Sequence, residues 1–143
     1  MQIGHHVTDR PLRVLIGSTP VGPLGSGVGG GVELTLQSLI HGLDALGHQI
    51  EVVAPAGSRI AGAQVHQIEG TFQVSSQLVD RSNPAEIPAE SVLGAMWNHI
   101  ADVQHEVDIV LNLAYDWLPL YLTQFFEVPV VHLISMASLN DVM

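Results

Sequence analysis

A glycine-rich loop at residues 18–31 contains the groups of this 143-residue chain that are best suited to binding a ligand. Glycine lets backbone amides approach a ligand closely, and the prolines of the loop exclude helix and central strand. An amphipathic helix is predicted to follow directly, and the positive N-terminal end of a helix attracts anions. The loop is therefore predicted to bind an anionic group such as phosphate. The alternative is a surface connector without a ligand.

Two known nucleotide-binding patterns do not account for this loop. Gly25, Gly27 and Gly30 fit the spacing GxGxxG, but prolines separate them from the preceding strand. The second predicted strand ends in Val53 and Ala54, where a dinucleotide fold has an acidic residue. A nicotinamide-dependent dehydrogenase is therefore disfavoured. The chain also lacks lysine, which excludes a Walker-type phosphate clamp.

The sequence gives little support for a metal site or for a catalytic cysteine or histidine. The eight histidines show no HExxH or other ligand spacing, so no metal site is predicted. The absence of cysteine excludes disulfides and thiolate zinc sites. His132 lies inside an apolar run and is interpreted as a hydrogen-bonded core residue rather than a catalyst.

Composition limits the partners of the chain. Acidic residues outnumber basic ones by 14 to 4, for a net charge of -10. Such a chain repels nucleic acid and anionic membranes. Charged residues amount to 13% and apolar residues to 47%, which predicts that part of the surface is covered by another domain. Neither a targeting segment nor a membrane span is recognised, and a cytoplasmic location is predicted.

Strand and helix patterns alternate along the chain after a polar tail at residues 1–11. The expected strands are residues 12–17, 49–57, 65–69, 71–74, 108–114 and 128–135. The expected helices are residues 32–46, 92–103 and a short one beginning near Trp117, while the surroundings of Asn83 and Pro84 are expected to be open loop. Near-continuous apolar strands that alternate with helices predict an α/β fold. We expect residues 12–143 to form a Rossmann-like domain, an open parallel sheet with helices on both faces.

Several short patterns accompany the predicted loop and helix. The first is GGxE, formed by Gly30, Gly31 and Glu33. The second is a leucine followed by Gly-His and two valines, formed by Leu43, Gly47, His48, Val52 and Val53. With the preceding strand, this run resembles the start of GT-B glycosyltransferases of family 4. Looser similarities are Asp108 to Val110 with Asp116 and Trp117, and the run at residues 128–135. Leu111, Tyr115, Ser135 and Met136 stand where that family usually has His, His, His and Asp.

The resemblance implies the N-terminal, acceptor-binding half of a GT-B fold. Such enzymes move a sugar, with retention, from a nucleotide sugar such as a UDP- or GDP-sugar to an acceptor hydroxyl, without a metal or other cofactor. The donor is held mainly by a C-terminal domain, so this chain is expected to be a fragment that is inactive alone. The alternative is a stand-alone, non-catalytic module that binds a sugar or a nucleotide.

The resemblance also implies roles for individual residues. Gly29, Gly30 and Gly31 are expected to bind the donor diphosphate. Candidates for contacts with the acceptor or a sugar are Ser18, Thr19, Glu33, Tyr115, Asp116 and Ser135. Three of these have structural alternatives. Glu33 suits the macrodipole of the first helical turn, Asp116 suits an N-cap, and the ring of Tyr115 can pack at the rim.

Overall fold

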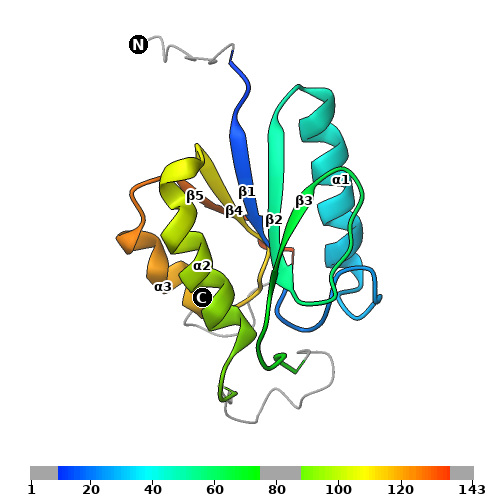
Figure 1. Cartoon of the computed structure of the whole chain (residues 1–143), viewed down its shortest axis with the longest axis vertical. Helices are drawn as coiled ribbons and strands as arrows, with labels where there is room; N and C mark the ends of the chain where they lie inside the picture. The colour runs from blue at the N-terminus through cyan, green and yellow to red at the C-terminus, as the bar shows by residue number, and fades with distance from the viewer. Residues whose placement is uncertain (1–9, 75–87, 136–143) are drawn as a thin grey trace.

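A computed structural model of the protein describes residues 10–74 and 88–135, and its five strands form one parallel sheet (Figure 1). The strands are β1 (Arg13–Gly17), β2 (Gln49–Pro55), β3 (Gln64–Ile68), β4 (Ile109–Asn112) and β5 (Val130–His132). Their order is β3-β2-β1-β4-β5, which is the order of a Rossmann-like sheet. The predicted α/β class and the parallel sheet are therefore confirmed.

The strand order reverses direction at β1. The chain proceeds from β1 outward to β2 and β3 and then returns to place β4 on the other side of β1. Gly17, the last residue of β1, pairs with Asn112, the last residue of β4. Open parallel sheets bind their ligands outside the carboxyl ends of the strands at such a reversal. The segments that follow Gly17 and Asn112 are therefore the first place to look for a site.

Helix α1 (Gly31–Ala45) covers one face of the sheet, as Figure 1 shows. Its buried side chains, Leu36 and Ile40, pack in one cluster with Val14, Ile16 and Val52. These strand residues alternate with ones that point to the opposite face, because successive side chains of a strand point to opposite sides.

The end of α1 follows the predicted glycine signal. Gly47 has φ 84°, and its amide donates to the Asp44 carbonyl at 2.8 Å. The His48 amide donates to the Leu43 carbonyl at 3.0 Å, which completes a Schellman motif. His48 Nδ1 then accepts a hydrogen bond from the Leu12 amide at 3.0 Å. The Gly-His pair therefore ends the helix and ties it to the start of β1.

Helix α2 (Val92–Val103) covers the other face together with α3 (Trp117–Leu122) (Figure 1). Two short 3-10 helices follow them, η1 (Gln104–Glu106) and η2 (Thr123–Phe125). Ser91 caps α2 by accepting from the Gly94 amide. Met96, Trp97 and Ile100 have no exposed surface and form the centre of this face.

Ile100 and Trp97 of α2 pack against Gly17, the last residue of β1. A Cβ on Gly17 would lie 3.1 Å from Ile100 Cδ1 and 3.5 Å from Trp97 Cζ2. The indole also packs edge-on against Phe126, with ring centroids 5.7 Å apart. The lack of a side chain at residue 17 therefore helps α2 to lie close to the carboxyl end of β1.

Two predicted strands differ from the structure. Residues 71–74 do not join the sheet: Thr71 forms only an isolated bridge with Ser91, because its amide and carbonyl pair with Glu90 and Val92 at the start of α2. The last strand covers three residues rather than 128–135, and Pro129 has no amide to extend the ladder before Val130. The expected loop around residues 83 and 84 lies outside the described residues.

The helices in the described part of the chain are all too short or too polar to cross a membrane. The longest of them, α1, contains 15 residues.

Candidate functional site

The candidate site lies at the carboxyl edge of the sheet, where the strand order reverses. The glycine loop follows β1, and Tyr115 and Asp116 follow β4. Ser135 follows β5 at the same edge and is exposed, one strand farther from the loop. The structure therefore places most of the predicted site residues around one end of the sheet.

Glu33 closes the glycine loop. Its Oε2 accepts a hydrogen bond from the Gly25 amide at 3.1 Å, and its Oε1 accepts one from the Gly27 amide at 3.2 Å. The loop thus folds around a carboxylate from the first turn of α1, so an anionic group already occupies two of its amides. A sugar or phosphate cannot use those amides while Glu33 holds them. The GGxE pattern therefore has a structural meaning here, which is to fix the shape of the loop.

The three predicted phosphate-binding glycines differ in what their amides do. The Gly30 amide donates to the Gly27 carbonyl at 3.1 Å, and Gly30 has φ 55°, a conformation that favours glycine. The amides of Gly29 and Gly31 have no partner within residues 10–74 and 88–135. A Cβ on Gly31 would meet open space. Gly29 and Gly31 are therefore the donors left for a ligand, while Gly30 shapes the turn.

The turn after β2 is hydrogen-bonded to the glycine loop and contains an arginine, Arg59. Ser58 Oγ accepts from the Leu24 amide at 2.8 Å, and the Arg59 amide donates to the Leu24 carbonyl at 3.0 Å. The Arg59 carbonyl would lie 3.3 Å from a Cβ on Gly25. Arg59 is exposed, and its guanidinium forms no ion pair with the described residues. Sequence reasoning missed this residue, although it is one of only four basic residues and follows a strand end.

Ser18 and Thr19 lie under the loop rather than on its surface. Their exposed fractions are 0% and 7%. The Ser18 amide donates to the Val53 carbonyl at 3.0 Å, which continues the pairing of β1 with β2. The Thr19 methyl group would lie 3.2 Å from a Cβ on Gly29. Both residues therefore position the loop, and neither offers an open hydroxyl to a ligand in this conformation.

Asp116 is the N-cap of α3, in agreement with the structural alternative. Its Oδ1 accepts from the Leu118 amide at 2.9 Å, and its Oδ2 accepts from Gln73 Nε2 at 2.7 Å. The Gln73 amide in turn donates to the Pro20 carbonyl at 3.0 Å. Gln73 therefore links the glycine loop to the segment after β4. The neighbouring Tyr115 is partly buried.

A partly buried polar network joins β4 and β5 to the segment of α3 and η2. Asn112 Nδ2 donates to His132 Nδ1 at 3.0 Å, and this leaves the proton of the neutral ring on Nε2. His132 Nε2 then donates to Thr123 Oγ1 at 2.8 Å, and the hydroxyl donates to the Pro119 carbonyl at 2.9 Å. Burial lowers the pKa of His132, which favours this neutral form. Both ring nitrogens make hydrogen bonds, as predicted, but His132 is only partly buried on the edge strand β5 and is not a core residue.

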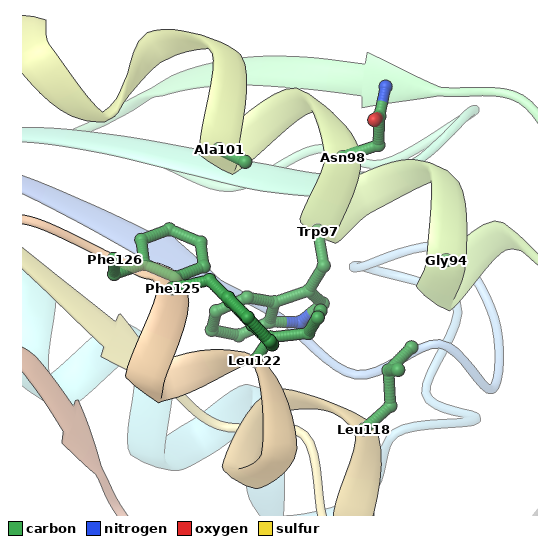
Figure 2. A pocket seen from close by; sticks show the side chains of 8 residues that line it. All are labelled: Gly94, Trp97, Asn98, Ala101, Leu118, Leu122, Phe125 and Phe126. Carbon is green, nitrogen blue, oxygen red and sulfur yellow. The ribbon is translucent and has the colours of Figure 1, made fainter.

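An apolar pocket of about 320 Å³ lies between α2 and α3. Figure 2 shows Trp97 in its floor, with Leu118, Leu122 and Phe126 around the ring. The indole Nε1 is buried and has no hydrogen-bond partner among the described groups. Asn98 supplies the polar side chain of the lining. The lining is mainly apolar and carries no charged side chain, so the pocket suits an apolar group better than a sugar or a phosphate.

No family model matches this sequence, and no curated protein matches it. Within the described residues, no group of three or more His, Asp or Glu side chains is arranged to hold a metal ion.

Proposed function

We propose that this chain is the acceptor-binding N-terminal domain of a retaining glycosyltransferase that takes a sugar from a nucleotide-sugar donor. The observation that carries the proposal is the pair of unpartnered amides, Gly29 and Gly31, at the start of α1 and beside the strand-order reversal. Helix N-termini at this position of an open parallel sheet bind phosphate. The proposal of sugar transfer itself comes from the resemblance of the sequence to GT-B glycosyltransferases of family 4.

The proposal assigns the donor and the acceptor to different groups at the carboxyl edge of the sheet. The Gly29 and Gly31 amides hold part of the donor diphosphate, and the positive end of α1 stabilises its charge as the leaving group departs. Arg59 lies beside the loop and adds a cation that pairs with phosphate oxygens. Tyr115 and the exposed Ser135, which follow β4 and β5, are proposed to contact the acceptor. Main recognition of the nucleotide belongs to a C-terminal domain of the same chain, and no metal takes part.

Glu33 and Asp116 act in this proposal through the backbone. Glu33 fixes the shape of the loop that contains Gly29 and Gly31, and Asp116 fixes the start of α3 beside Tyr115. Both carboxylates are positioning groups rather than ligands. The proposed enzyme works in the cytoplasm. Its proposed acceptor is soluble or neutral, because the net charge of -10 disfavours binding to anionic membranes and nucleic acid.

A second candidate is a non-catalytic module that binds a sugar or a nucleotide. It is favoured because three titratable side chains at the carboxyl edge of the sheet already make hydrogen bonds within the protein. Both oxygens of Glu33 and of Asp116, and both nitrogens of His132, already make hydrogen bonds. Such a site provides binding groups without a free general base.

Amide chemical-shift mapping tests the proposed site. The ¹⁵N-labelled chain is titrated with UDP-glucose and GDP-mannose up to millimolar concentrations. We expect the largest shifts at Gly29, Gly31 and Arg59, and a loss of most of the response in Arg59→Ala. Arg13→Ala is the matched control, because Arg13 is an exposed arginine at the opposite end of β1. Shifts that cluster elsewhere, or none with either nucleotide sugar, would contradict the site.

Transfer activity separates the two candidate functions. Sugar transfer is assayed with the chain and with the complete gene product in which we place the donor-binding domain. The glycosyltransferase proposal predicts turnover by the complete product and negligible turnover by residues 1–143. Binding without turnover in both supports the non-catalytic module.

A further inference from the structure

Three titratable side chains meet on the α2 face of the sheet, on elements other than the glycine loop. They are Glu51 of β2, His66 of β3 and His99 of α2. Glu51 Oε2 lies 2.5 Å from His66 Nε2, and His66 Nδ1 lies 3.1 Å from His99 Nε2. The exposed fractions of the His66 and Glu51 side chains are 22% and 33%, so the cluster is open to solvent.

The carboxylate determines which nitrogen of His66 is available. An ionised Glu51 can only accept a hydrogen bond, so His66 Nε2 carries the proton that it donates. In the neutral ring, Nδ1 then presents its lone pair toward His99. His99 makes no other hydrogen bond with the described residues, so its proton can lie on Nδ1 and leave Nε2 free. Two imidazole lone pairs can therefore face the same space.

We propose that His66 Nδ1 and His99 Nε2 bind one divalent transition-metal ion, with water completing its coordination. Imidazole nitrogens suit Zn²⁺, Ni²⁺ and Cu²⁺. Zn–N bonds of about 2.0–2.1 Å at a tetrahedral angle place two ligand nitrogens roughly 3.3–3.4 Å apart. The observed separation of 3.1 Å requires an adjustment of only a few tenths of an ångström. The two rings are tilted by 46°, and they come from a strand and a helix 33 residues apart in sequence.

Glu51 acts as the partner that orients a metal-binding histidine. Ligand histidines commonly donate their second ring N–H to a carboxylate, which fixes the tautomer and raises the basicity of the ligand nitrogen. Glu51 stands in that relation to His66. The net charge of -10 also raises the local concentration of cations.

The number of ligands defines the kind of site. Two histidines fall short of the four ligands of a structural zinc centre, so the site takes an exchangeable ion. The position of the site between a strand and a helix means that a bound ion would stabilise the contact between them. β3 is at the edge of the sheet, and His99 ties it to α2. An ion between the rings strengthens this contact and raises the stability of the folded chain by mass action.

The test uses Cu²⁺ alone, added to the ¹⁵N-labelled chain in which His5 and His6 are replaced by alanine. These adjacent histidines form a competing chelator in the sequence. We expect saturable, one-to-one binding, with paramagnetic broadening centred on His66 and His99. This measurement on otherwise unchanged protein does not depend on any site variant folding. Zn²⁺ should bind the same site more weakly than Cu²⁺, and it should raise the melting temperature.

Variants then assign the ligands. His66→Ala and His99→Ala should each abolish saturable binding and the rise in melting temperature, while Glu51→Gln should weaken binding by about 10–100-fold. His105→Ala is the matched control and should change nothing, since His105 is an exposed histidine on η1. Broadening centred elsewhere, or unchanged affinity in His99→Ala, would overturn the proposal and leave the two rings as a hydrogen-bonded pair.

Discussion

The glycine loop and the α2 face of the sheet are held in place by opposite means. Residues 25–28 of the loop are exposed, and a few polar atoms of Glu33 and Ser58 fix the loop. On the α2 face, Met96, Trp97 and Ile100 are fully buried among apolar neighbours. The loop can therefore change shape at little cost in the free energy of folding, whereas the α2 face cannot. The proposed phosphate-binding groups lie in the first region, whereas the second contributes buried apolar side chains to the free energy of folding.

The largest expected effect is at Trp97. Trp97→Ala should lower the free energy of unfolding by about 3–5 kcal/mol, because it removes a fully buried ring from the α2 face. Urea denaturation measures this change. Trp97→Phe is the matched control. It keeps an aromatic ring and removes an indole N–H that has no partner within the described residues, so it should cost clearly less. An equal loss in both variants would contradict this account of the face.

A smaller effect is expected from the backbone of the loop. Gly30→Ala should cost about 1–3 kcal/mol, because alanine is strained at φ 55°. Gly31→Ala is the matched control. A Cβ there meets open space, and residue 31 is already helical, so the stability should be unchanged or slightly higher. Thermal unfolding of both variants tests the difference, and equal melting temperatures would show that Gly30 does not need this conformation.

Glu33 should affect motion more than stability. Glu33→Gln keeps one acceptor oxygen and loses the charge, so its cost should be about 1 kcal/mol or less. Hydrogen exchange at the Gly25 and Gly27 amides should accelerate, because these amides donate to the carboxylate. Exchange on β1 should stay unchanged. Unaltered exchange at both glycines would show that the carboxylate does not hold the loop.

The smallest effect concerns an ion pair outside both regions. Arg10 contacts Asp108 at 2.7 Å, and this hydrogen bond together with one from the Arg13 amide lowers the pKa of Asp108 to about 2. A lowered pKa stabilises the fold fully above the ordinary value of 3.8, and this stability is lost as the pH falls through about 2. The acid-unfolding curve of Asp108→Asn should therefore differ from the parent curve above pH 3.8 and approach it near pH 2. A constant difference across this range would argue against the pair.

The sequence predicted the elements whose signals are local. The apolar run of β1 and the amphipathic helix α1 each have a pattern that needs no knowledge of the rest of the fold. The last strand was predicted too long, and residues 71–74 were wrongly predicted to be a strand. In both cases the apolar pattern could not reveal which backbone partner the segment has.

The candidate site could be predicted in position but not in contacts. A loop after the first strand of a parallel sheet falls at the carboxyl edge, so the place of Gly29 to Gly31 followed from the pattern. The contact of Glu33 with Gly25 and Gly27 depends on how the loop folds back, and no spacing rule encodes it. The position of Arg59 depends in the same way on the pairing of two turns from different strands.

The central claim is that the carboxyl edge binds the phosphates of a nucleotide sugar through free amides, and Gly31→Val tests it most directly. The Kd of UDP-glucose or GDP-mannose is measured by amide shifts, alongside the melting temperature, in the parent chain and the variant. Binding is expected to be at least about tenfold weaker, because the branched valine side chain would keep a phosphate away from the amide of residue 31, and a hydrogen bond to a charged group contributes about 1.5–3 kcal/mol. The melting temperature should stay nearly unchanged, because residue 31 faces open space. An unchanged Kd in the folded variant would contradict the claim and leave the loop as a connector.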